Sequence, residues 1–330
     1  MNESQYQGTV LGLAVGDALG YPAEFMSRQQ IQKMFGTDGI TDFVKLPESE
    51  FDSEVFSNSL ELSGHPPGTF TDDTQMSIAV AEALLESQSH DVDTVMSAVA
   101  RRFVEWSRSE DNDRAPGDTC MQGCANLAKG THWSGAGVSD SKGCGSAMRV
   151  SPIGLFYEDL DKVREIARAS SLLTHGHDAA VAGAEAAAMM VALALRGLAP
   201  AGIFDEVAKT CGPSSQEFAQ VWQKVPEVLH LPPEQVLVDQ VLGESWVADE
   251  AVASAMYCFW KHPDDFCAAV LMAINTDGDS DSIGAITGSI VGARLGLEAI
   301  PTAWCRQVEA SKYLHELGTR LWNGRRKSDR

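Results

Sequence analysis

Three aspartates at alternate positions, Asp277, Asp279 and Asp281, open the stretch INTDGDSDSIGAITGSIVGARLG at residues 274–296. Carboxylates this close together repel one another unless a cation lies among them. Their oxygens, without an adjacent His or Cys, favour a hard ion such as Mg²⁺, Ca²⁺ or Mn²⁺. A solvated helix N-terminus explains the same residues, because Asp suits both capping and the helix dipole. The segment alone leaves both interpretations open.

The Asp-x-Asp-x-Asp start is also typical of an EF-hand calcium loop. Such a loop needs glycine at its sixth position and a bidentate glutamate at its twelfth. Counted from Asp277, these positions hold Ser282 and Gly288. The EF-hand interpretation therefore fails.

A second polar cluster lies at residues 65–75, HPPGTFTDDTQ, directly before the apolar run MSIAVAEALLE. The pattern predicts a helix that begins near Thr71 with good N-terminal chemistry. A cap needs one Asp or Thr, whereas four such residues, Thr71, Asp72, Asp73 and Thr74, precede the apolar run. Capping does not account for all of them.

Two predicted helices with glycine at every fourth position determine where these polar clusters lie in the fold. The stripes are Gly284, Gly288 and Gly292 after the aspartates, and Gly8, Gly12, Gly16 and Gly20 near the N-terminus. Glycine inside a helix costs up to about 1 kcal/mol relative to alanine, so each stripe needs a packing reason. We expect the two helices to pack tightly together, with Asp17 and Glu24 at the polar end of the first.

Helical periodicity dominates the sequence and no linker divides it, which predicts a single all-α domain over residues 1–330. Residues 34–64 lose this periodicity, which predicts a lid or a functional insertion. The basic residues at 324–330 are predicted to form a frayed tail. The alanine-rich run at 179–195 contains Glu185 and is predicted to be a buried helix rather than a membrane span.

The net charge of −21 argues against nucleic acids and anionic membranes as partners, because both reward basic surfaces. The N-terminus has neither a basic region nor a continuous apolar core, so no signal peptide is predicted. Seven cysteines without a repeated spacing favour reduced thiols. We therefore expect a cytoplasmic protein that binds neither nucleic acid nor membrane.

Five motifs together resemble those of the ADP-ribosylglycohydrolase family, which includes the hydrolase that releases ADP-ribose from dinitrogenase reductase. They are GDALGYPAEF at 16–25, GTFTDDTQM at 68–76, KGCGSAMRVSPIGL at 142–155, LTHGH at 173–177 and GDSDSIGAITG at 278–288. The motifs follow the family's order and span most of the chain. The resemblance implies a compact orthogonal all-α fold around a binuclear Mg²⁺ or Mn²⁺ centre.

Carried over by position, the resemblance implies that two helix starts supply the metal ligands. These ligands would be Thr71, Asp72, Asp73, Asp279, Asp281 and Ser282. Ser282 stands where threonine is common in the family and keeps the hydroxyl. Asp277 stands where the family often has glycine, so it is left outside the ligand set. Asp73 and Asp281 also count among the expected catalytic residues.

Glu24 matches a family glutamate beside the site, which makes it the candidate general base or water-orienting group; a surface acid at a helix end is the alternative. Another acid that the family uses lies in the loop at 110–118, where the motifs single out no residue. The substrate diphosphate would lie in a cradle of Ser141, Lys142, Gly143, Cys144 and Gly145, with His175 at the diphosphate or the distal ribose. Cys144 replaces an asparagine found in some branches.

The implied activity is metal-dependent release of ADP-ribose from an ADP-ribosylated protein, by hydrolysis of the N-glycosidic bond to arginine. The metals would hold the ribose hydroxyls and lower the pKa of the attacking water. The segments GDALGYPAEFM and GCGSAMR are more similar to the arginine-cleaving branch than to the serine-cleaving one. Serine or a small molecule as acceptor, and a non-catalytic role like that of the lens crystallins in the family, are the alternatives.

Overall fold

The computed structural model describes residues 1–44, 65–238 and 241–325. Throughout these ranges the regular structure is helical, and β-structure is limited to two isolated bridges, Val138 with His175 and Gly143 with Val247. The predicted all-α fold is confirmed. Most of the lid predicted at 34–64, and the tail predicted at 324–330 apart from its first two residues, lie outside the described residues.

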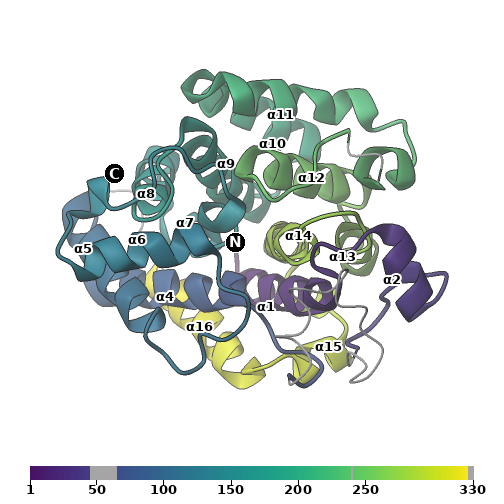
Figure 1. Ribbon diagram of the computed structural model, residues 1–330, viewed down its shortest axis with the longest axis horizontal. Coiled ribbons are helices and arrows are strands. Elements are labelled where there is room, and N and C mark those ends of the chain that lie inside the picture. Colours follow the sequence, from purple (N-terminus) through teal and green to yellow (C-terminus); the bar gives the residue numbers. More distant parts are fainter. Residues whose placement is uncertain (45–64, 239–240, 326–330) are drawn as a thin grey trace.

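The helices stack around two central ones, α1 and α14 (Figure 1). The α-helices are α1 Glu3–Gly20, α2 Arg28–Phe35, α4 Asp72–Ser87, α5 Val92–Trp106, α6 Asp118–Ala128, α7 Ser151–Phe156, α8 Leu160–Leu172, α9 Asp178–Leu195, α10 Pro200–Thr210, α11 Gln216–Val228, α12 Ala248–Lys261, α13 Phe266–Ile274, α14 Ser280–Leu295, α15 Thr302–Gln307 and α16 Ser311–Gly324. Short 3₁₀ turns at Tyr21–Ala23 (η1) and Cys144–Ser146 (η3) lie between them.

The two glycine stripes face each other, as the sequence predicts. A Cβ atom placed on Gly16 would lie 2.0 Å from the carbonyl oxygen of Gly284, and one on Gly288 would lie 2.0 Å from that of Gly12. Real Cβ atoms are never this close to a carbonyl oxygen, so the backbones of α1 and α14 touch directly. The pairs run in opposite directions along the sequence, so the helices are antiparallel and the C-terminal end of α1 lies beside the start of α14.

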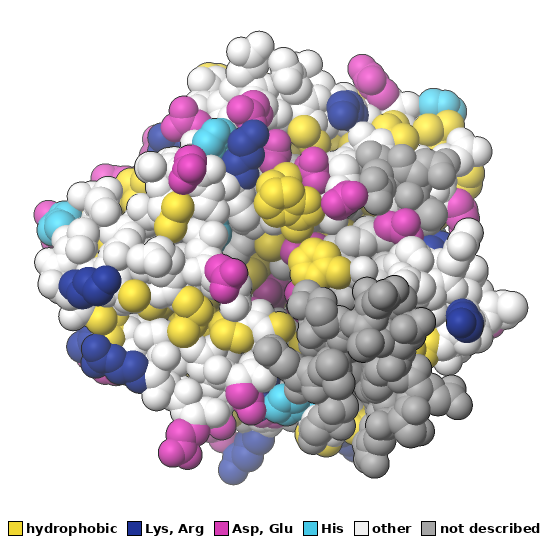
Figure 2. Space-filling model, viewed as in Figure 1, with side chains coloured by type: hydrophobic (Ala, Val, Ile, Leu, Met, Phe, Trp, Pro, Cys, Tyr) yellow, Lys and Arg dark blue, Asp and Glu magenta, His cyan; other side chains and the backbone are white. Residues whose placement is uncertain are grey.

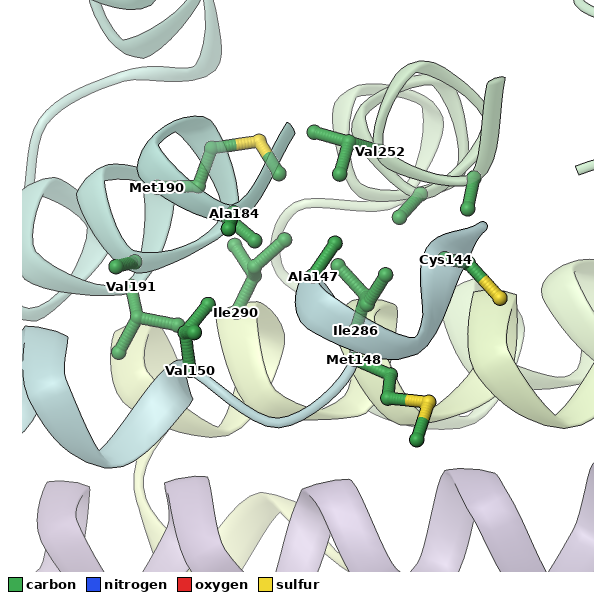
Figure 3. Close-up of a cluster of buried hydrophobic side chains, with 14 of the residues drawn as sticks. Cys144, Ala147, Met148, Val150, Ala184, Met190, Val191, Val252, Ile286 and Ile290 are labelled. Atoms are coloured by element: carbon green, nitrogen blue, oxygen red, sulfur yellow. The ribbon is translucent and has the colours of Figure 1, made fainter. Parts of the chain in front are cut away.

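Helix α9 packs against α14 and α12 in the core. It is the one described helix that is long and apolar enough to cross a membrane, yet 94% of it is buried inside the molecule. This confirms the buried helix predicted at 179–195. Figure 3 shows Met190 and Val191 of α9, Val252 of α12 and Ile286 of α14 converging on the segment that starts at Cys144. Packing in this cluster fixes the position of the segment that starts at Cys144 relative to α14.

Candidate active site

The starts of α4 and α14 meet at a cavity of about 750 Å³. The turn after η1, the loop before α6, the η3 segment and the residues around Trp246 complete its wall. Figure 2 shows a hollow in the middle of one face, with acidic side chains inside it and hydrophobic side chains along its edge. Ligand sites in proteins are typically about 300–1,000 Å³, so the cavity has room for a dinucleotide-sized molecule.

Five of the six predicted metal ligands line this cavity, although about 200 residues separate the two helix starts. They are Asp72, Asp73, Asp279, Asp281 and Ser282. Glu24, the candidate general base, lies on the same wall. Thr71 is buried but is not part of the wall, so a ligand role for its hydroxyl stays a prediction.

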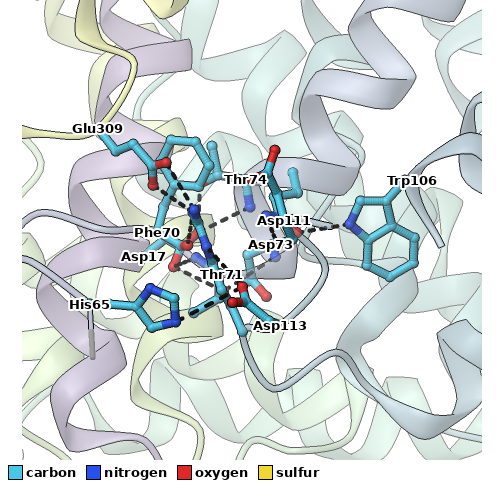
Figure 4. Close-up of polar contacts among 12 residues, drawn as sticks. Asp17, His65, Phe70, Thr71, Asp73, Thr74, Trp106, Asp111, Asp113 and Glu309 are labelled. Atoms are coloured by element: carbon cyan, nitrogen blue, oxygen red, sulfur yellow. Dashed lines mark hydrogen bonds and ion pairs between the residues drawn. The ribbon is translucent and has the colours of Figure 1, made fainter. Parts of the chain in front are cut away.

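Thr71 instead holds the start of α4 in place through hydrogen bonds to Asp73 and Asp17. Its hydroxyl caps the helix by accepting from the backbone N–H of Asp73 and donates to Oδ1 of Asp17 at 3.0 Å. Asp17, on α1, also accepts from the backbone N–H of Thr71 and from the N–H and hydroxyl of Thr74. Figure 4 shows Asp17 beside Thr71, with Asp73 on the far side of Thr71 from Asp17. Asp17 was expected at the polar end of its helix, and its role in holding the start of α4 has no signal in residue spacing.

The start of α14 is held in a similar way. The Asp279 side chain caps the helix by accepting from the backbone N–H of Ser282 at 3.3 Å. The thiol of Cys144 donates to the other Asp279 oxygen at 2.9 Å and lies 3.4 Å from the Ser282 hydroxyl. Cys144, which belongs to the cradle predicted for the diphosphate, therefore also contacts the acidic cluster.

Asp72, Asp73 and Asp281 on the wall are almost fully buried, and burial beside other carboxylates raises their proton affinity. Burial raises the pKa of Asp72 to about 7, and the charges of Asp17 and Asp279 add to this. Burial, with the neighbouring carboxylates, holds the pKa of Asp73 and of Asp281 well above the usual range. Glu24 is the largest charge contribution at Asp281. These carboxylates resist losing their protons together unless positive charge enters the cavity.

This donor set fits a divalent cation. Asp73 Oδ2 and Asp281 Oδ1 are buried and make no hydrogen bond to the described part of the protein, which is costly unless something else satisfies them. Carboxylate and hydroxyl oxygens are ligands that Mg²⁺ and Mn²⁺ prefer. Among residues 1–44, 65–238 and 241–325, however, no three His, Cys, Asp or Glu side chains form a ready metal-binding group. The two buried oxygens without a hydrogen bond nevertheless point to a cation, because rotation of their side chains would bring the carboxylates around one.

Three of the five residues of the predicted diphosphate cradle line the cavity, together with His175. Gly143, Cys144, Gly145 and His175 lie on its wall. A Cβ atom on Gly143 would lie 2.9 Å from His175 Nε2, and one on Gly145 would lie 2.9 Å from His175 Cε1. The two glycines are therefore needed for the loop to lie against the imidazole.

Ser141 and Lys142 are not part of that wall. The Ser141 hydroxyl lies 3.0 Å from the hydroxyl of Thr119, and the Lys142 ammonium forms an ion pair with Glu217. Both side chains are partly exposed. Their contact with substrate stays a prediction, and for Lys142 it requires release from Glu217.

The loop at 110–118 contributes one acid to the cavity. Asp118 lines the wall, and the backbone N–H of Gly117 donates to Oδ2 of Asp72 at 3.2 Å. Arg114 holds the loop in place by donating to the carbonyl oxygen of Phe70 and to Glu309. Asp118 is thus the acid of this loop that lies on the cavity wall, and whether it takes the part of the family's second acid stays a prediction.

A profile of the ADP-ribosylglycohydrolase family matches residues 2–330. The chain belongs to the ADP-ribosylglycohydrolase family. It is accordingly an ADP-ribosyl hydrolase, which acts on ADP-ribosylated substrates and has ADP-ribose as product. The cavity is the place in this family member where the predicted metal ligands, a candidate base and a glycine-lined loop come together.

Known proteins similar to the chain agree with this assignment. An uncharacterized protein of Archaeoglobus fulgidus is 33% identical, over 97% of this chain and 96% of its own length. ADP-ribosylhydrolase ARH3 of Gallus gallus is 28% identical, over 96% and 92%. ADP-ribosylarginine hydrolase Tri1 of Pseudomonas putida is 25% identical, over 96% and 77%. A solved structure of an ADP-ribosylglycohydrolase-related protein complex superposes with a TM-score of 0.67 at 26% identity, covering 97% of this chain and 98% of that one.

Proposed function

We propose that this ADP-ribosylglycohydrolase releases ADP-ribose from protein arginine side chains, with two Mg²⁺ or Mn²⁺ ions bound at the starts of α4 and α14. The observation that carries the proposal is the convergence of buried carboxylates from both helix starts, together with Glu24, on one cavity. Asp72, Asp73, Asp279, Asp281 and Ser282 would hold the ions. When bound, divalent cations lower the pKa of water and orient hydroxyl groups of a substrate.

Glu24 takes the part of the base in this proposal. It would accept the proton of the attacking water while the bond from the anomeric carbon to the arginine nitrogen breaks. The same proton then passes to the departing guanidine nitrogen, which restores the guanidinium and the Glu24 carboxylate. A positioned carboxylate of this kind contributes roughly 10²–10⁴-fold to the rate.

Two exposed aromatic side chains support arginine as the acceptor. Phe25 and Trp246 line the cavity, and about half of each residue is exposed. Phe25 directly follows Glu24, has a φ angle of 57°, and donates its backbone N–H to the Gly278 carbonyl oxygen at 2.7 Å. A bulky residue rarely adopts this backbone region, so the fold holds the ring at the cavity edge against a conformational cost.

A guanidinium group suits such an edge. It is planar, stays charged at neutral pH, and stacks favourably on aromatic rings. Glu24 and Asp118 add negative charge to the same cavity, whereas a serine ether oxygen carries no charge for these groups to attract. The relative Tri1 is an ADP-ribosylarginine hydrolase, which supports the same acceptor. The relative ARH3, whose name specifies no acceptor, is slightly more similar.

The test is a side-by-side assay on two peptides that carry ADP-ribose on arginine or on serine at the same position. We expect faster release of free ADP-ribose from the arginine peptide. The Trp246→Leu variant should raise KM for that peptide by roughly fivefold or more, the scale of a cation–π contact, while Trp246→Phe should keep most of the affinity. Faster release from the serine peptide would overturn the arginine assignment and leave the reaction class intact.

A further inference from the structure

Arg149 is a buried cation without a carboxylate partner in the described part of the chain. Its side chain is fully buried, with the guanidinium carbon 4.6 Å from the centre of the Phe103 ring. None of the ion pairs within residues 1–44, 65–238 and 241–325 includes it. Burying a charge without a counter-ion is costly. Such a residue therefore needs a reason beyond packing.

The guanidinium instead donates to three oxygen atoms, one of them in the glycine-containing loop 143–145 on the cavity wall. Nη1 donates to the carbonyl oxygen of Gly145 at 2.8 Å, and Nη2 donates to the carbonyl oxygen of Ser170 and to the hydroxyl of Thr174, each at 2.8 Å. Gly145 belongs to the loop on the cavity wall, and Thr174 precedes His175. Arg149 thus connects the loop with the histidine that lies against it.

The Thr174 hydroxyl lies between the Arg149 guanidinium and the imidazole of His175 and contacts both. Its oxygen lies 2.8 Å from His175 Nδ1. A guanidinium can donate but never accept, and a hydroxyl has one proton to give. The Thr174 oxygen accepts from Arg149, so its own proton needs an acceptor, and His175 Nδ1 provides one. The opposite arrangement, Nδ1–H donating to the hydroxyl, leaves the hydroxyl proton without an acceptor among the described contacts.

The other ring nitrogen, Nε2, then carries the proton. It faces the loop, since a Cβ atom on Gly143 would lie 2.9 Å from it, and His175 is part of the cavity wall. Burial, with the charge of Arg149, lowers the pKa of His175 to about 3, so the imidazole is neutral at physiological pH. A neutral imidazole with the proton on Nε2 presents a donor at this wall and no acceptor.

The backbone of His175 is held in place as well. Its N–H donates to the carbonyl oxygen of Ser171 at 2.7 Å, and its carbonyl oxygen accepts from the Ser171 hydroxyl at 3.0 Å. On the other side, Val138 donates to the carbonyl oxygen of Thr174 at 2.8 Å. These hydrogen bonds fix the position of the His175 backbone. The imidazole ring can still rotate and can carry its proton on either nitrogen.

We propose that Arg149 is a positioning residue that acts through the Thr174 hydroxyl to hold His175 as the Nε2–H tautomer, a donor to an anionic oxygen of the substrate diphosphate. The diphosphate part of this inference rests on the proposed function, and the tautomer part does not. The wall here combines a neutral donor, a glycine loop and a nearby buried cation, an arrangement that suits an anion.

Nitrogen-15 NMR of the histidine rings tests the tautomer on the full-length, Mg²⁺-loaded protein. We expect the wild-type His175 to carry its proton on Nε2 and to stay neutral between about pH 5 and pH 8. Thr174→Val has nearly the same shape but lacks the hydroxyl, so the Nδ1 resonance should move as its hydrogen bond is lost. Thr174→Ser should restore the wild-type resonance.

A proton on Nδ1 in the wild-type protein would overturn the proposal, even if Thr174→Val failed to fold. An identical Nδ1 resonance in wild type and Thr174→Val would also overturn it. Adding ADP-ribose should shift the Nε2 resonance, and Thr174→Val should bind ADP-ribose about tenfold more weakly, with Thr174→Ser close to wild type. If ADP-ribose binds but leaves Nε2 unmoved, the diphosphate role is wrong while the tautomer assignment stands.

Discussion

The carboxylate of Asp17 accepts hydrogen bonds from both the backbone N–H and the hydroxyl of Thr71, at 2.9 and 3.0 Å, although 54 residues separate them. Asp17 is on α1 and Thr71 is the N-cap of α4. Because α1 also packs backbone to backbone against α14, one helix sets the position of both acidic helix starts.

Replacing Asp17 with asparagine should loosen the start of α4. An amide offers one acceptor oxygen where the carboxylate offers two, and its NH₂ group would face the donors of Thr71 or Thr74. We expect a loss of about 3 kcal/mol in the free energy of unfolding, the scale of hydrogen bonds to a charged group. Mg²⁺ affinity, measured by calorimetry, should fall as well.

The matched control for this variant is Asp265→Asn. Asp265 caps α13 by accepting from the backbone N–H of Ala268 at 3.0 Å, and asparagine caps helices about as well as aspartate. Its stability and Mg²⁺ affinity should stay close to wild type. Equal stability of Asp17→Asn and Asp265→Asn would show that Asp17 does not organise α4.

Adding one methyl group between the central helices should be costly. The new carbon in Gly16→Ala would lie 2.0 Å from the Gly284 carbonyl oxygen, so α1 and α14 must separate. Overpacking of this kind costs about 1–3 kcal/mol, more than the roughly 1 kcal/mol that alanine gains in helix propensity. Urea unfolding measures the difference. Gly135→Ala, where the new atom meets nothing within 4 Å, should change little, and a Gly16→Ala variant as stable as that control would refute the tight contact.

The metal-free protein should become less stable as the pH rises. The folded-state pKa of Asp72 is raised to about 7, and those of Asp73 and Asp281 are held well above the usual range, whereas unfolded aspartate titrates near pH 3.9, as a rough reference value. Between these pKa values the folded state holds more protons than the unfolded state, so stability falls from about pH 4 to pH 7.

Divalent cations compete with these protons, so their stabilising effect should grow over the same range. We expect the difference in Tm with and without excess Mg²⁺ to widen from about pH 5 to pH 7.5. Thermal scans at matched ionic strength measure it. A difference that stays constant with pH would mean that the buried carboxylates do not bind the ion.

Two variants should separate binding from turnover. Asp281→Ala removes a buried carboxylate that has an unsatisfied oxygen, so it should lose metal affinity and ADP-ribose affinity together. Glu24→Ala should keep both affinities and lose turnover by roughly 10²-fold or more. Calorimetry and single-turnover kinetics distinguish these patterns. If Glu24→Ala no longer binds ADP-ribose, Glu24 has a structural role instead.

The sequence predicts those features that neighbouring residues determine. The spacing of Gly12, Gly16, Gly284 and Gly288 implied a close helix pair, because small side chains at period four leave a groove along one helix face. The run from Thr71 to Thr74 implied a helix start with surplus polar groups. In both cases the physical cause is local in the sequence, and the structure places the residues accordingly.

Other features depend on partners that only the folded chain brings together. Lys142 belongs to the glycine-rich motif, but Glu217, 75 residues later, pairs with it outside the cavity. Asp118 becomes a wall residue because Arg114 anchors its loop to Phe70 and Glu309. The contacts of Arg149 with Thr174 likewise have no signal in residue spacing. Burial and side-chain direction decide these roles, and neither can be deduced from one sequence.

The proposed reaction is hydrolysis of an ADP-ribosyl bond in the acidic cavity, with the help of divalent cations. The most direct measurement is release of free ADP-ribose from an ADP-ribosyl-arginine peptide by protein stripped of metal, before and after Mg²⁺ or Mn²⁺ is restored. We predict no turnover in excess chelator and full recovery when either ion is added back. Full turnover by the stripped protein in excess chelator would show that the reaction needs no divalent cation.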